Sequence, residues 1–327
     1  MFANSLVTTK YHAIFYFLSL VSARAAFPQN TVEHGINLFD AEKFDQAKQV
    51  FEKILESNAN DSQAHYFLGR IYFNLGKHDD AVKYLQRAVT IAEGNIDFHF
   101  GLADVYGFKT RTASFLSAGK WAGKWKKELE RAYEIDPKNL EARRRLINYY
   151  LNAPVIGGGD KEKGKRLAEE TIHIDEIQGR LLLADAFRQT GKMALAVAEY
   201  KKVLELDPQN GAAYNSLGYF FLGQKDYAAA ESHFKKYIEV VTADPNAYDS
   251  MGDYYSRRGM VDSAMAQYQK ALEVDPKFST SRFNLAQAYE EKKMTAEAIR
   301  HYEKIIELTP GHARAEDAGK RIKKLKK

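Results

Sequence analysis

The strongest constraint on how this chain folds is an internal repeat. Eight consecutive segments cover residues 28–312 with no residue left between them, and six of the eight are identical in length. A fixed period of roughly 34 residues is typical of proteins that stack copies of one small unit, so we expect one elongated array. The segments are 28–61, 62–95, 96–139, 140–176, 177–210, 211–244, 245–278 and 279–312.

Small and bulky residues recur at matching places in these segments. The eighth position holds Gly or Ala in seven segments, and the twentieth holds Ala in six. Only small side chains let two helices approach closely, so these positions predict where the two helices of a unit cross. Large aromatic residues stand at other fixed positions and are expected to fill the gaps. The small residues at the eighth position are Gly35, Gly69, Ala103, Ala184, Gly218, Gly252 and Ala286.

The clearest unit is 62–95. It carries Leu68-Gly69, Tyr72, Gly76, Ala81 and Ala88 at defining places, and residues 28–312 as a whole resemble the tetratricopeptide repeat family. The resemblance implies an all-α fold, a right-handed superhelical solenoid of about eight antiparallel helix pairs within residues 26–312. It also implies that a concave face binds other proteins or extended peptides and carries no chemistry.

The C-terminal segment 313–327 is expected to cap the array. Ala315, Ala318, Ile322 and Leu325 recur at helical spacing with charged residues elsewhere, as in the polar helix that ends a solenoid. Six of its Lys and Arg residues lie after position 319, so they alone exceed the formal net charge of +5 of the whole chain. The basic excess is therefore a property of the tail, and we expect no nucleic-acid partner. The alternative is contact of this tail with anionic lipid headgroups or nucleic acid.

The N-terminal residues 1–25 resemble an export signal. Lys10 precedes a mostly apolar run over 13–21, and Ala23-Arg24-Ala25 predicts cleavage before Ala26. The apolar run is shorter than the roughly 20 residues of a membrane span, so we expect an exported protein, periplasmic or secreted, with no stable span after cleavage. An uncleaved segment that serves as an interfacial anchor is the alternative. The chain has no cysteine, which excludes disulfides and lipid attachment at a cysteine.

Two segments depart from the regular length. The third is the longest of the eight, with its extra residues around 107–123, and the fourth contains Pro154 and three glycines within 152–159. We expect inserted loops here, and such loops often carry the specificity of a repeat protein. Residues 107–170 contain 15 Lys or Arg and 9 Asp or Glu, so this basic region is a candidate contact surface. The alternative is a longer helix pair with a solvated charged face.

The inner face of the array is expected to come from five positions of each first helix. These positions alternate with the packing positions, and they place aromatic residues beside polar ones in the second and third segments, a combination suited to protein recognition. The Lys, Asn and Arg pattern with which some family members hold a chaperone's C-terminal carboxylate is absent. The partner-binding residues that we predict are Tyr66, Arg70, Phe73, Asn74, Phe100, Asp104, Phe108, Trp121, Arg144 and Asn148.

Catalytic, cofactor and metal sites are not expected. Residues 159–165 match the glycine spacing of a phosphate-binding loop, but Arg166 stands where that motif needs Ser or Thr, and no buried strand precedes it. The nine histidines show no paired spacing of metal ligands. We therefore predict a non-enzymatic scaffold of the cell envelope that binds partners through the concave groove and the inserted loops of the third and fourth repeats. The alternative is a module that captures one extended peptide segment in the groove, as a periplasmic chaperone or assembly factor would.

Overall fold

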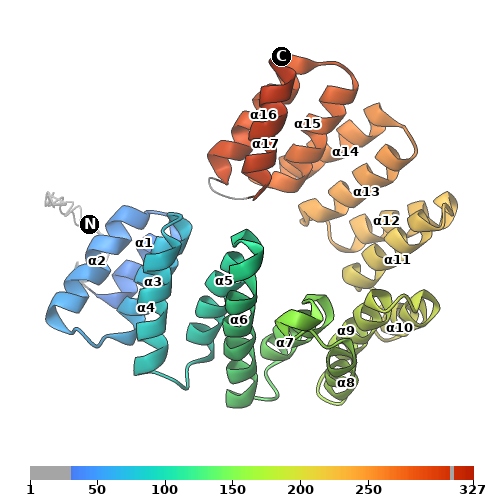
Figure 1. Ribbon diagram of the computed structural model, residues 1–327. Helices are drawn as coiled ribbons and strands as arrows, with labels where there is room; N and C mark the ends of the chain where they lie inside the picture. Colours follow the sequence, from blue (N-terminus) through green and yellow to red (C-terminus); the bar gives the residue numbers. More distant parts are fainter. Residues whose placement is uncertain (1–30, 310–312) are drawn as a thin grey trace, which may run out of the picture.

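The fold is an all-helical array. The computed structural model describes residues 31–309 and 313–327, so the predicted signal segment lies outside the described residues. No strand occurs in these ranges, and the expected solenoid of helix pairs is confirmed (Figure 1). The helices are α1 (Val32–Asp40), α2 (Phe44–Ser57), α3 (Ser62–Asn74), α4 (His78–Ile91), α5 (Ile96–Thr112), α6 (Phe115–Ile135), α7 (Leu140–Asn152), α8 (Lys161–Thr171), α9 (Glu176–Gln189), α10 (Met193–Leu206), α11 (Gly211–Gly223), α12 (Tyr227–Val240), α13 (Pro245–Arg257), α14 (Val261–Val274), α15 (Ser279–Glu291), α16 (Thr295–Leu308) and α17 (Ala313–Leu325), with a 3₁₀ turn, η1 (Val155–Gly157), between α7 and α8.

Short polar side chains set where most first helices begin. The Asp61 carboxylate accepts a hydrogen bond from the backbone N–H of Ala64 at 2.8 Å, and Asn139 and Asn210 cap α7 and α11 in the same way. Such a cap satisfies an N–H group that has no partner inside the helix. The linker between two units is therefore short, and consecutive helices pack as antiparallel neighbours.

The small eighth-position residues allow the close crossings that the sequence predicts. A Cβ atom added at Gly252 would lie 2.4 Å from the Tyr268 ring, and one at Gly218 would lie 2.6 Å from the Phe234 ring. Tyr268 and Phe234 are both buried. The aromatic residue of the second helix thus occupies the space that the glycine of the first helix leaves free.

The helix pairs follow one another around an open ring (Figure 1). The last pairs curve back towards the first, and Lys277 Nζ lies 3.1 Å from the Glu42 carboxylate although 235 positions separate them. At the C-terminal end α17 packs on the last pair, where Ala318, Ile322 and Leu325 join the cluster around Tyr302. Residues 313–325 thus cover the apolar edge that the last pair would otherwise expose.

The expectation of an inserted loop in the third repeat is wrong. The extra residues lengthen both helices, so that α5 has 17 residues and α6 has 21, and only Ala113 and Ser114 connect them. The physical reason is packing along the extension. Trp125 lies against Gly107, where an added Cβ would be 3.0 Å from its ring, and the Trp121 and Tyr106 ring centroids are 5.7 Å apart.

The fourth repeat does have an irregular segment between its helices. Gly158 has φ of +86°, and a Cβ at Gly159 would lie 1.8 Å from the carbonyl oxygen of Ala153, so neither position accommodates a side chain without strain. The Tyr149 hydroxyl lies within hydrogen-bonding distance of two carbonyl groups, those of Ala122 in α6 and Gly157 in the turn. This hydroxyl ties the turn to the extended helix pair.

Candidate binding groove

Three pockets of one design lie along the array. Each is lined by the first and second helices of one pair and by the first helix of the next pair. We call them the hairpin pocket (α5, α6, α7 and the turn after α7), the central pocket (α9, α10, α11) and the C-terminal pocket (α13, α14, α15). Their volumes are about 540, 390 and 160 Å³, in that order. Each contains an aspartate at the ninth position of its repeat, Asp104, Asp185 or Asp253.

The hairpin pocket combines an apolar floor with a basic rim. Ala122, Trp125 and Leu129 of α6 form one side, and Tyr149, Ala153 and Pro154 form the other. The polar residues that line it are Asp104, Thr110, Arg111, Arg144, Arg145, Asn148 and Asn152. Apolar surface with a few convergent polar groups is typical of binding pockets.

An ion-pair network orients two of these arginines. Arg145 lies 2.7 Å from Asp104 and 2.6 Å from Glu141, and Arg144 also lies 2.6 Å from Glu141. Burial would raise the pKa of Glu141, but hydrogen bonds from Arg145 and Arg144 hold this pKa below its usual value. Glu141 is therefore ionised at neutral pH and fixes both guanidinium groups at the wall of the pocket.

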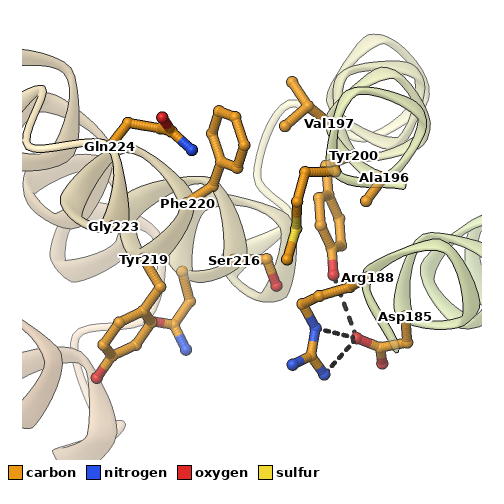
Figure 2. A pocket seen from close by; sticks show the side chains of 12 residues that line it. Asp185, Arg188, Ala196, Val197, Tyr200, Ser216, Tyr219, Phe220, Gly223 and Gln224 are labelled. Atoms are coloured by element: carbon orange, nitrogen blue, oxygen red, sulfur yellow. Dashed lines mark hydrogen bonds and ion pairs between the residues drawn. The ribbon is translucent and has the colours of Figure 1, made fainter. Parts of the chain in front are cut away.

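The central pocket is nearly balanced in charge. Figure 2 shows that Arg188 and the Tyr200 hydroxyl both contact the Asp185 carboxylate, at 3.1 and 3.2 Å. Met193, Ala196, Val197 and Phe220 provide apolar parts of the lining. The side-chain oxygen of Asn215, which also lines this pocket, is buried without a hydrogen-bond partner in the described structure.

The C-terminal pocket is the acidic end of the series. Asp253 accepts hydrogen bonds from the hydroxyls of Tyr219 at 2.8 Å and Tyr268 at 3.0 Å. Asp249, 3% exposed, lies beneath it and accepts a 2.6 Å bond from Ser281. Burial raises the pKa of the Asp249 carboxyl to about 6, although the Ser281 hydrogen bond opposes the rise. The three pockets thus change from basic to acidic along the array.

Predicted residues of the second repeat, on α3, pack against aromatic residues of the third repeat, on α5. Tyr66 stacks on Phe98 with centroids 4.9 Å apart, and Arg70 donates a 2.7 Å hydrogen bond to the Tyr66 hydroxyl. Phe73 meets Phe108 edge to face at 5.7 Å. Tyr66, Arg70, Phe73 and Phe108 are half-buried, whereas Asn74 is exposed at the end of α3. Partner contact through these residues stays a prediction.

Asp104, Arg144 and Asn148 are brought together in the hairpin pocket, but two other predicted residues are not. Phe100 is 8% exposed, because it packs against Ala132 and Ala142 with the Arg145 guanidinium 4.5 Å above its ring. It belongs to the core beneath the groove, so the expectation that it faces solvent or a ligand is wrong. Trp121, one helical turn before Trp125, is half-buried outside the pocket lining, where the ammonium groups of Lys109 and Lys124 lie 4.4 and 5.3 Å from its ring.

Sequence reasoning missed Arg111 and Trp125 as pocket residues. When the extra residues of the third repeat are left out, Trp125 corresponds to the twentieth position of the regular repeats. A small packing residue is the rule there, and the repeat pattern marks Trp125 only as an exception to that rule. Its size was the available signal, because a tryptophan at a helix crossing must push the neighbouring elements apart. Arg111 gave no such signal, since its place on the pocket depends on the extra turns of α5.

The described ranges contain neither a metal-binding cluster nor a helix suited to cross a membrane. No cluster of three or more His, Asp or Glu side chains there could hold a metal ion. None of the helices described combines the length and the apolar character that a membrane crossing requires.

Comparison with known structures agrees with the helical array. A tetratricopeptide repeat protein from Parabacteroides merdae aligns with 90% of this chain and 97% of its own, at 14% identity and a TM-score of 0.53. A thermophilic tetratricopeptide protein from Thermus thermophilus aligns with 55% of this chain and 91% of its own, at 22% identity and a TM-score of 0.42. At these identities the likeness concerns the fold alone. No curated protein matches the sequence.

Sequence models of the repeat place most of the array in one family. Tetratricopeptide repeat models match residues 32–96 and 181–248, 252–293, and 280–312, which together make up more than half of the chain. The unmatched stretch 97–180 contains the lengthened α5–α6 pair and the turn after α7. The chain belongs to the tetratricopeptide repeat family.

Proposed function

We propose that this protein is a non-enzymatic scaffold that binds other proteins through the groove lined by its first helices. The repeat fold itself is one that serves protein–protein contacts. The observation that carries the proposal is the row of three pockets with the same construction and graded charge. A surface that changes from basic to acidic favours partners whose charges are opposite to it at each place along the groove.

Capture of one extended segment is the second candidate. The unpartnered oxygen of Asn215 in the central pocket favours it, because a buried acceptor is costly until an N–H group pairs with it. The backbone of an extended peptide supplies such N–H groups at regular intervals. A scaffold would contact several folded proteins, whereas a capture groove would hold one segment tightly.

We also propose that the protein acts outside the cytoplasm, in the cell envelope or beyond it. Support comes from residues 1–25, where an apolar run and small residues precede the expected cleavage site. N-terminal sequencing of the protein purified from fractionated cells tests this. A mature chain that begins at Ala26 in the exported fraction is expected, and an intact Met1 in the cytosolic fraction would contradict it.

The test of the binding function is lysine cross-linking in the native compartment, followed by identification of the attached proteins and residues by mass spectrometry. A recurring set of proteins linked near the pocket rims is expected. A double variant, Tyr66→Ala with Phe73→Ala, should reduce recovery of these partners if the second repeat contributes. Lys235→Ala, an exposed change on the second helix α12, is the control. No recurring protein partner would contradict the scaffold function.

A further inference from the structure

The two irregular segments of the chain meet at one place. Thr110, Arg111 and Ala122 belong to the turns that lengthen α5 and α6, and Ala153 and Pro154 belong to the segment after α7. All five line the hairpin pocket. The Tyr149 hydroxyl connects the two parts, since it contacts the Ala122 carbonyl at 2.9 Å and also the Gly157 carbonyl. Repeats of the regular length would lack these walls.

The interior of this pocket suits an apolar side chain. Its volume of about 540 Å³ is the largest of the three, and its floor is the Trp125 ring with Ala122 and Leu129. Trp125 is held edge to face against Tyr149 with centroids 5.0 Å apart, so the floor is preformed. An occupant would gain aromatic contact without reordering the pocket.

The rim adds a requirement for negative charge. Residues 107–127 contain basic side chains and no Asp or Glu. Arg144 and Arg145 already hold Glu141 and Asp104, whereas Arg111 is exposed and makes no ion pair or hydrogen bond within the described residues. One cation at the pocket is thus available to a ligand. Asn148 lies on α7 and lines the pocket half-buried. Its side-chain amide has no hydrogen bond among the described residues.

We propose that the hairpin pocket anchors an extended segment of a partner protein that carries an apolar side chain next to a carboxylate. The apolar side chain rests on Trp125, the carboxylate pairs with Arg111, and the Asn148 amide bonds the segment's backbone. This inference rests on the proposed function, because it names the partner chemistry of one part of the same groove. A ligand that is only anionic would meet one free cation at an exposed position, which is weak by itself.

The first experiment uses the full chain and a displayed library of random dodecapeptides. Enriched sequences should pair Asp or Glu with a neighbouring Leu, Ile, Phe or Trp. One enriched peptide, labelled with a fluorophore, is then titrated with the protein by fluorescence anisotropy. Arg111→Glu should weaken its binding roughly tenfold, because attraction becomes repulsion at one rim position. Lys127→Glu makes the same change of charge on α6 away from the pocket lining, and should change the affinity by no more than about twofold to threefold.

A pair of substitutions at Asn148 tests the interior of the pocket. Asn148→Trp fills the cavity and should abolish binding of the peptide, whereas Asn148→Ala removes only the amide and should weaken it about threefold to tenfold. Circular dichroism of both variants checks that the helices remain. If Asn148→Trp fails to fold, the comparison of Arg111→Glu with Lys127→Glu still decides the question.

Three results would overturn the inference. Equal losses with Arg111→Glu and Lys127→Glu would show general attraction to a basic hairpin. Loss only with Arg188→Glu, in the central pocket, would leave groove binding intact but place the anchor elsewhere. Enrichment of basic peptides, or of no peptide at all, would also refute the predicted ligand chemistry. In that case, recurring protein cross-links would still support the proposed scaffold function.

Discussion

At the scale of single residues, the turn inside each regular repeat depends on one left-handed position. Gly76, Gly191 and Gly259 have φ between 71° and 74° there. In the other regular repeats Glu42, Lys225 and Lys293 occupy the same position, with φ between 57° and 61°. A side chain in this region is strained against the backbone, by about 1–2 kcal/mol, whereas glycine is not. The repeats thus differ in stability at one backbone position.

This strain predicts opposite effects for two matched substitutions. Lys293→Gly should stabilise the protein by about 1 kcal/mol, because relief of strain exceeds the added chain entropy of glycine. Gly259→Lys should destabilise it by a similar amount, since a Cβ there meets no atom within 4 Å and only the backbone is strained. Urea unfolding followed by circular dichroism measures both. Shifts of the midpoint in the same direction would contradict this explanation.

The buried Asp249 predicts a dependence of stability on pH. Its pKa rises from an ordinary value of 3.8 to about 6 in the folded protein, so the native state binds the proton more tightly than the unfolded state. The contribution of Asp249 to the free energy of unfolding is therefore fully present below a pH of about 4 and is lost as the pH rises through about 6. This contribution is on the order of 3 kcal/mol.

Asp249→Asn should remove that dependence. An asparagine oxygen can still accept the bond from Ser281, but the side chain does not ionise. The urea midpoint of the wild type should therefore fall relative to that of the variant between pH 4 and pH 7. If the urea midpoints of the two proteins changed in parallel over this pH range, ionisation of Asp249 would not destabilise the folded protein.

At the scale of helices, the regular repeats could be predicted from the sequence and the extended one could not. Gly218 and Gly252 mark crossings because a fixed separation joins each to the aromatic ring that covers it. The extra length around residues 107–123 was interpreted as a loop, yet Gly107, Gly119 and Gly123 in this stretch all lie inside α5 or α6. Gly107 faces Trp125, a contact between different helices that local sequence does not reveal. The hairpin pocket was missed for the same reason, because Arg111 and Pro154 meet only in three dimensions.

The extension predicts that the hairpin can be shortened without loss of the fold. Replacing residues 109–121 with Leu-Gly-Lys, the turn of the second repeat at positions 75–77, returns the third repeat to the regular length. Because each pair packs its apolar face mainly against its neighbours, the seam around Phe98 and Leu129 should survive. We expect cooperative melting by circular dichroism with a loss of about 1–3 kcal/mol, since the contacts of Trp121 disappear. A broad, non-cooperative transition would show that the extension is part of the core.

At the scale of the whole molecule, the curvature of the array brings its two ends together. Glu42 lies in the turn between α1 and α2, Lys277 in the turn before α15, and their charged groups are 3.1 Å apart. Both side chains are about two-thirds exposed, and such a pair contributes at most about 1 kcal/mol. The stacking of the helix pairs, rather than this ion pair, therefore sets the ring-like shape (Figure 1).

Distances between spin labels test whether helix stacking, and not the Glu42–Lys277 ion pair, sets the curvature. The chain has no cysteine, so Glu42→Cys with Lys277→Cys gives two unique labelling sites and deletes the ion pair at the same time. If repeat stacking sets the curvature, double electron–electron resonance spectroscopy should still show a short distance between the two spin labels. A second pair of labels at Glu42, between α1 and α2, and His173, between α8 and α9, should give a longer distance. Helices α8 and α9 lie across the ring from α1 and α2 (Figure 1). A long or very broad distribution for the first pair would mean that the array opens without the ion pair, and the groove would then widen and close with ionic strength.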